Sequence, residues 1–103
     1  MVGAVLELRH LKTLLALREH GSLVAAAADL CLTPSAISHQ LKELDHCYGV
    51  EVVNRRSRPV SFSNVGERLL KLADDVLPQV QIAQTDITRI VHGQTGRIIF
   101  SSE

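Results

Sequence analysis

The chain has 103 residues, 46% of them apolar, and its acidic and basic side chains cancel to a net charge of zero. This length supports one modest core, which aliphatic side chains must fill because aromatic residues are scarce. The chain has neither an apolar run of membrane-spanning length nor a signal-peptide pattern, so we expect a cytoplasmic protein with no membrane partner.

The first predicted helix spans about residues 7–20. Leucines recur through this segment at helical spacing, and Gly21 follows as a terminator. We expect this helix to pack behind the next two as the third helix of a small core.

Residues 21–49 have the pattern of two helices joined by a very short turn. Ser22 can cap the first helix, whose four consecutive alanines allow a close helix crossing. Thr33 can cap the second, with Pro34 at the first helical position, where its absent N–H costs nothing. Gly49 is placed to end that helix in a left-handed conformation. The pattern predicts a helix-turn-helix.

The second helix of this motif has two different faces. Its apolar residues repeat at helical spacing and predict a buried face, formed by Ile37, Leu41, Leu44 and Tyr48. The opposite face carries small polar and basic residues, namely Ser35, Ser38, His39 and Lys42. One face can therefore pack while the other is free to contact DNA.

Cys31 and Cys47 are predicted to lie at or near buried helical faces as structural thiols, since they lack Cys-x-x-Cys spacing. A metal site formed by His39, His46 and Cys47 is disfavoured, because adjacent residues on a helix point in different directions. We therefore expect no metal site.

Valines on either side of residues 54–59 predict two short strands around a basic turn, a β-hairpin wing. Pro59 keeps the hairpin short. Residues 33–62 contain four basic and three acidic side chains, and three of the basic ones are Arg55, Arg56 and Arg58. So little excess charge predicts weak DNA binding by one copy, and affinity that depends on two copies acting together.

Ser63 is a plausible cap for a long helix that extends to about Val91. Its apolar residues follow steps of four and three, with one extra residue between Val76 and Val80. Leu70, Leu77 and Ile82 widen this stripe beyond what a solitary solvated helix needs, which predicts contact with another chain as well as with the amino-terminal core. Pro78 predicts a kink. Residues 97–100 have the pattern of an opening strand of a further domain.

Each functional interpretation has a plainer alternative. The polar helix face could be merely solvated, the arginines could form an ordinary charged turn, and the long stripe could cover only the core. No nucleophile elbow, phosphate-binding loop or paired carboxylates indicate an enzyme. The rival class is a helical protein-interaction module, which salt-dependent retention on duplex DNA would distinguish.

The succession of these motifs resembles the LysR-type bacterial transcription regulators over essentially the whole chain. The resemblance rests on Gly-Ser-Leu with alanines, on Thr-x-Ser-Ala-Ile-Ser-His-Gln-Leu, on the wing, and on Gly66 before a leucine-rich helix. The stretches 10–14, 35–40, 69–73 and 76–79 look most like the branch of MetR regulators of methionine biosynthesis.

The resemblance implies a mainly α fold: a winged helix-turn-helix with a three-helix core, followed by a long dimerisation helix. It divides the chain into a DNA-binding domain at 1–62, a linker helix at 63–92, and at 93–103 a hinge and first strand of an effector domain. The DNA-binding positions are Ser22, Thr33, Pro34, Ser35, Ser38, His39, Lys42, Arg55, Arg56 and Arg58. The dimer positions are Leu69, Leu72, Val76, Val80, Ala83, Ile87 and Ile90.

The function that the resemblance implies is sequence-specific transcription regulation, in which a homodimer binds double-stranded DNA at an interrupted palindrome. The alternatives are a LysR-type regulator of another pathway and the protein-interaction module. No cofactor is expected in this stretch. The effector domain would bind a small-molecule co-inducer, homocysteine in the MetR branch. The resemblance also implies a tetramer at full length and RNA polymerase as a protein partner.

Overall fold

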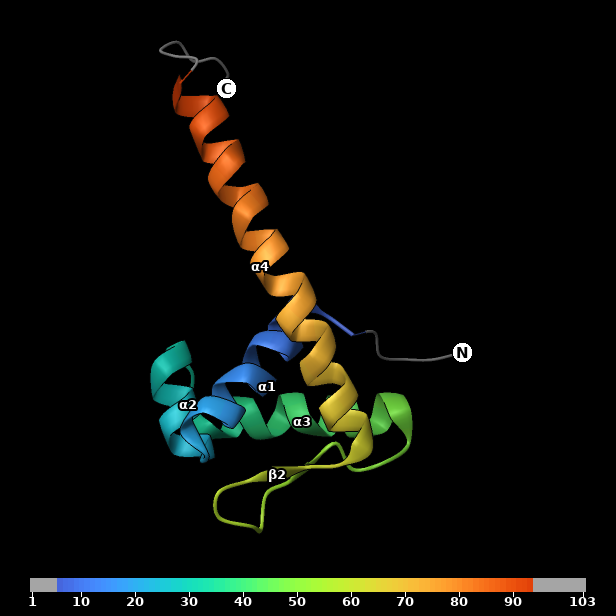
Figure 1. Ribbon diagram of the computed structural model, residues 1–103. Helices are drawn as coiled ribbons and strands as arrows, with labels where there is room; N and C mark the ends of the chain where they lie inside the picture. The colour runs from blue at the N-terminus through green and yellow to red at the C-terminus, as the bar shows by residue number, and fades with distance from the viewer. Residues whose placement is uncertain (1–5, 94–103) are drawn as a thin grey trace.

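The computed structural model describes residues 6–93, which form four helices and one two-stranded sheet. In chain order these are α1 (Leu8–His20), α2 (Leu23–Leu30), α3 (Pro34–Tyr48), β1 (Val53–Asn54), β2 (Ser61–Phe62) and α4 (Asn64–Gly93). Helices α1 to α3 form a small body above the hairpin, and α4 crosses this body and then projects away from it (Figure 1). The predicted winged helix-turn-helix with a long helix is confirmed.

Helix ends follow the predicted local signals. Gly21 and Gly49 close α1 and α3 in the left-handed conformation, with φ of 77° and 72°. Ser22 Oγ and Thr33 Oγ1 each accept the backbone N–H three residues further on, at 3.1 Å. Because these caps satisfy N–H groups that a helix start leaves unpaired, the turn between α2 and α3 can stay short.

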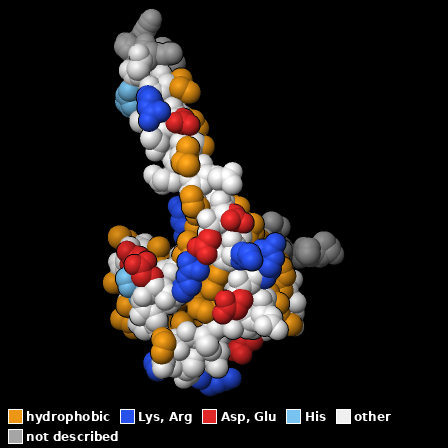
Figure 2. All heavy atoms as spheres, in the orientation of Figure 1, with side chains coloured by type: hydrophobic (Ala, Val, Ile, Leu, Met, Phe, Trp, Pro, Cys, Tyr) orange, Lys and Arg blue, Asp and Glu red, His pale blue; other side chains and the backbone are white. Residues whose placement is uncertain are grey.

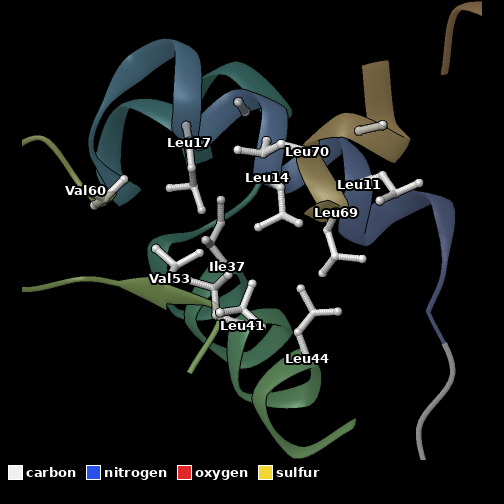
Figure 3. Packing of buried hydrophobic residues seen from close by; sticks show 14 of the residues in the cluster. Leu11, Leu14, Leu17, Ile37, Leu41, Leu44, Val53, Val60, Leu69 and Leu70 are labelled. Carbon is white, nitrogen blue, oxygen red and sulfur yellow. The ribbon is translucent and has the colours of Figure 1, made fainter. Parts of the chain in front are cut away.

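The core lies where α1, α3, the hairpin and the start of α4 meet (Figure 3). The side chains of Leu14, Leu17, Ile37 and Leu41 are fully buried there. From α4 the same cluster takes Leu69, Leu70 and Ala73. The first part of α4 is thus a structural element of the body.

Two residues lie elsewhere than the sequence predicts. Tyr48 was expected on the buried face of α3, but it is the last helical residue and is 39% exposed, because α3 extends past the core there. Cys31 was expected near a buried face, but it is the left-handed cap that ends α2, so its side chain turns into solvent. Cys47 is half-buried, and neither cysteine forms a disulfide within residues 6–93.

The wing is a short antiparallel hairpin, as predicted, in which Val53 pairs with Phe62. Its base is attached to the helical body by a hydrogen bond from the Val60 N–H to the Gly21 carbonyl, at 3.0 Å. The Ser63 N–H donates to the Val52 carbonyl, also at 3.0 Å, which closes the base of the hairpin where α4 begins. The hairpin therefore keeps a defined position beside α2 and α3.

Helix α4 begins as predicted, because Ser63 Oγ accepts the Gly66 N–H at 3.3 Å. It continues through Pro78 without ending, and the kink expected there stays a prediction. Within residues 6–93, no helix is both long and apolar enough to cross a membrane. The strand predicted at residues 97–100 lies outside the described residues.

Candidate nucleic-acid interface

The polar face of α3 is open to solvent. Ser35, His39 and Lys42 are exposed and Ser38 is half-buried. These positions are separated by three or four residues, so they share one face, and the exposed Thr33 and Pro34 continue it at the start of the helix. The face presents hydroxyl, imidazole and ammonium groups, which can bond to base edges or phosphates.

A buried hydrogen bond fixes α3 against α1 behind this face. Thr13 Oγ1 donates to Gln40 Oε1 at 2.6 Å, and the two residues are 1% and 5% exposed. The sequence reasoning missed this pair, because 27 residues separate them and neither belongs to an apolar stripe. A buried polar pair needs this geometry to avoid a desolvation cost, so it restricts the orientation of α3.

Glu43 is the centre of a charged cluster at the edge of the same face. Its Oε1 lies 3.2 Å from Arg9 Nη2 and 3.1 Å from His10 Nε2, while its Oε2 lies 3.4 Å from His39 Nε2. The hydrogen bond from His10, with the positive charge of Arg9, lowers the pKa of the Glu43 carboxyl. This cluster joins α1 to α3, and no sequence pattern predicts it, because Arg9 and His10 are more than 30 residues away from Glu43 in the chain.

The wing arginines have different surroundings. Arg55 Nη2 lies 3.4 Å from Asp45 Oδ2, and Asp45 also accepts the Val52 N–H at 2.9 Å. The buried Nε of Arg55 has no hydrogen-bond partner in the part of the chain that the structure describes. Arg58 bends back and donates to the carbonyls of Arg55 and Ser57, at 2.9 and 3.2 Å. It therefore tightens the turn while remaining exposed.

A hollow lies between the start of α2 and the wing. It is lined by Ser22, Leu23, Val24, Arg55 and Arg58. The hollow brings Ser22 close to two of the wing arginines, which are more than 30 positions later in the chain. Two guanidinium groups beside the N-terminus of a helix form an environment suited to an anion.

On the surface formed by the exposed face of α3 and the wing, the charges do not cancel as the net charge of the chain suggests. Glu43 faces α1 and Asp45 faces Arg55, so these two acidic groups are already paired, while the third, the exposed Glu51, lies beyond the C-terminal end of α3. Lys42, Arg56 and Arg58 have no acidic partner within residues 6–93. Lys and Arg side chains gather at the tip of the wing, at the lower end of the molecule (Figure 2). The surface is therefore locally basic.

The second predicted surface lies on the projecting part of α4, where apolar side chains follow one edge of the helix (Figure 2). Ile82, Ile87, Ile90 and Val91 are 61, 58, 61 and 50% exposed. Ala83 is exposed too, and Val76 and Val80 are half-buried.

Two of the predicted dimer positions belong to the body instead. Leu69 is 7% exposed within this chain's own core, and Leu72 is partly buried against that core. The reason is that α1 covers the first part of α4, which the periodicity of the stripe could not indicate. Ile82 and Val91, absent from the predicted dimer positions, are exposed.

Residues 6–93 hold no group of three histidine, cysteine or acidic side chains that could bind a metal ion. His39, His46 and Cys47 do not form such a group.

Residues 8–67 match the model of the family described as "Bacterial regulatory helix-turn-helix protein, lysR family". Over all 103 residues the chain is 46% identical to the HTH-type transcriptional regulator MetR of Haemophilus influenzae, of which it covers 33%. It is 51% identical to MetR of Escherichia coli K12 over 79 residues, 77% of this chain and 25% of that protein. The chain thus spans a third or less of the length of these relatives.

Solved structures agree with these relatives. The structure titled as a complex of the BenM DNA-binding domain with benA site 1 DNA superposes with a TM-score of 0.75 and 31% identity, covering 86% of this chain and 100% of that one. A LysR family transcriptional regulator, VV2_1132, superposes with a TM-score of 0.74 and 30% identity, covering 85% of this chain and 30% of that one. Together with the family match over residues 8–67, they show that the chain belongs to the lysR family of bacterial regulatory helix-turn-helix proteins.

Proposed function

We propose that this chain is the DNA-binding part of a LysR-type transcription regulator, in which two copies pair through α4 and bind an interrupted palindrome. The observation that carries the proposal is the likeness to the BenM DNA-binding domain, whose solved structure is a complex with DNA. The likeness extends over that whole domain at 31% identity, so the helix-turn-helix and the wing have counterparts there.

In the proposed complex, the exposed face of α3 enters the major groove. Ser38 and His39 lie near the middle of this face, where they contact base edges. Thr33, Pro34, Ser35 and Lys42 lie around them and contact bases or the adjacent backbone.

The wing and the start of α2 hold the phosphate backbone in this proposal. Ser22, Arg55 and Arg58 surround one hollow that fits a phosphate group, while Arg56 extends from the tip of the wing. Such contacts position the protein on DNA without reading its sequence. The guanidinium of Arg55 lines this hollow although its Nη2 already faces Asp45.

The proposed dimer buries the apolar edge of α4. Isoleucines that are about 60% exposed are costly in solution, and burying the exposed part of one is favourable by about 1–2 kcal/mol. The interface consists of the proposed positions that the body leaves uncovered, namely Val76, Val80, Ala83, Ile87 and Ile90, with Ile82 and Val91 beside them. Pairing would set the distance between two α3 helices and hence the half-site spacing.

The relatives support further parts of the proposal. Because the MetR proteins are 46 to 51% identical to this chain, we propose genes of methionine biosynthesis as its targets. An effector domain outside this chain would bind the co-inducer, homocysteine, and would assemble dimers into a tetramer. RNA polymerase is the proposed partner at the promoter, the cytoplasm is the proposed location, and no enzymatic activity is proposed.

The experiment that tests this function is selection from a pool of random DNA duplexes at rising salt concentration, followed by sequencing of the retained fraction. At the proposed DNA-binding surface a dimer presents six cations without acidic partners within residues 6–93, two each of Lys42, Arg56 and Arg58. If each neutralises a phosphate, log affinity falls with log salt at a slope of about −5. A palindromic consensus with such a slope supports the proposal. A folded dimer that enriches no sequence and shows no salt dependence refutes it and favours the protein-interaction module.

A further inference from the structure

The cluster around Glu43 contains one member that belongs to the proposed DNA contacts. His39 is 73% exposed at its side chain, and its Nε2 faces the Glu43 carboxylate at 3.4 Å. No other polar contact of this imidazole is present among the described residues. The second ring nitrogen, Nδ1, is therefore available to a ligand.

Glu43 is itself held from α1. His10 Nδ1 accepts the Glu7 N–H at 3.0 Å, so the hydrogen of the neutral His10 ring is on Nε2, which can donate to Glu43 Oε1. Arg9 approaches the same oxygen. With Oε1 occupied by α1, Oε2 is the oxygen left for His39. An ionised carboxylate accepts hydrogen bonds and cannot donate one, so it favours the tautomer of His39 that carries its hydrogen on Nε2.

We propose that Glu43 is a positioning residue that determines how His39 reads DNA: it holds the neutral ring by Nε2–H, so that Nδ1 is presented to a base as a hydrogen-bond acceptor. This inference rests on the proposed function and adds a prediction of base identity. In the major groove an acceptor pairs with the amino groups of adenine N6 or cytosine N4, whereas guanine and thymine offer acceptors at the corresponding positions. His39 therefore selects adenine or cytosine at one position of each half-site.

The lowered pKa of the Glu43 carboxyl agrees with this role, because the group stays ionised, and hence accepting, at neutral pH. The cluster also explains how an acidic residue can lie beside a surface that binds phosphates. Arg9 and His10 reach Glu43 from α1, and His39 reaches it along α3, so its charge is compensated within the chain.

The test combines base selection with nitrogen NMR of the histidine rings, at a pH where the imidazole is neutral. Wild-type chain, His39→Ala, Glu43→Gln and the double variant are each used to select sites from random duplexes. Glu43→Gln retains an oxygen for His10 but offers His39 an amide that can donate, so discrimination at the adenine or cytosine position should fall about tenfold. If Glu43 acts through His39, the double variant should match His39→Ala.

A matched control exists in the other histidine–carboxylate contact, His20 with Asp29 at 3.3 Å, which is not on the exposed face of α3. Asp29→Asn should leave base preference unchanged. The proposal would be overturned if the effects of Glu43→Gln and His39→Ala on base preference were additive in the double variant. It would also be overturned if the wild-type chain preferred guanine or thymine at the position that His39→Ala alters.

The NMR measurement does not depend on DNA or on the folding of a variant. The neutral His39 ring of the wild-type chain should carry its hydrogen on Nε2, and finding it on Nδ1 would overturn the proposal directly. A chain with the expected tautomer that selects no sequence would refute the proposed function, and with it the reading of a base, while leaving the contact between Glu43 and His39 intact.

Discussion

Replacing Gly66 with alanine should destabilise the domain, although Gly66 lies in a helix where alanine is normally the better residue. A Cβ at this position would overlap the Val52 carbonyl oxygen and would lie 3.1 Å from the Phe62 Cβ. The carbonyl cannot easily retreat, because it accepts hydrogen bonds from Ser63 N at 3.0 Å and Ser63 Oγ at 3.2 Å. The new methyl group would therefore push α4 away from the wing.

The magnitude follows from two opposing effects. Overpacking against backbone costs about 3 kcal/mol at the upper end of the usual range. The higher helix propensity of alanine returns at most about 1 kcal/mol. The net loss in the free energy of unfolding is then about 2 kcal/mol, which corresponds to a decrease in melting temperature of about 10 °C for a domain of this size.

Urea and thermal unfolding followed by circular dichroism measure this loss. Gly93→Ala is the matched control, since it makes the same change in the same helix, and no atom of another element within residues 6–93 lies within 4 Å of the new Cβ. It should leave the unfolding free energy unchanged or slightly higher. The reasoning is refuted if Gly66→Ala is as stable as wild type or as the control.

Three further predictions concern charge and assembly. If two copies pair through α4 as proposed, Ile87→Lys should be a monomer in sedimentation equilibrium. Thr88→Lys, one residue further along the exposed helix, should remain a dimer. A dimeric Ile87→Lys would show that this edge of α4 is not the interface. Arg56→Ala should weaken binding to all duplexes alike and reduce the salt slope of a dimer by about 2. Ser38→Ala should relax base preference and reduce the binding free energy for the preferred site by about 1–3 kcal/mol. The reverse pattern would contradict both assignments. The bidentate contact of Arg18 with Asp74, at 2.8 and 3.1 Å, lowers the pKa of Asp74 below its usual value of 3.8. The contact therefore stabilises the folded domain above pH 3.8, and this contribution is lost as the pH falls through the lower pKa of the folded state. In urea unfolding between pH 2 and 6, Asp74→Asn should therefore lose less stability on acidification than wild type, and equal losses would contradict this role.

Local signals in the sequence were sufficient for the elements and their order. The caps at Ser22 and Thr33 and the glycines at 21 and 49 each act within a few residues, so their effect can be read without knowing the fold. The apolar stripe of α3 likewise predicted three buried residues correctly. It failed at Tyr48, because periodicity does not show where a helix extends past the core.

The candidate site was predicted less completely, because its geometry depends on contacts between distant segments. The periodicity of α4 gave no sign that α1 would cover Leu69. The environment of His39 depends on Arg9 and His10, more than 28 residues away, and a pattern within α3 does not contain that information. The polar face itself was predictable, since it is the complement of the buried stripe.

The central claim is that two copies, held at a fixed distance by α4, read two half-sites together. Its most direct test is the affinity of the chain for the selected palindrome before and after five base pairs are inserted between the half-sites, which is about half a turn of the double helix. We predict that the insertion reduces the affinity to that of a duplex with one half-site, because the second half-site is rotated to the opposite side of the DNA. Equal affinity for the two duplexes would contradict the account.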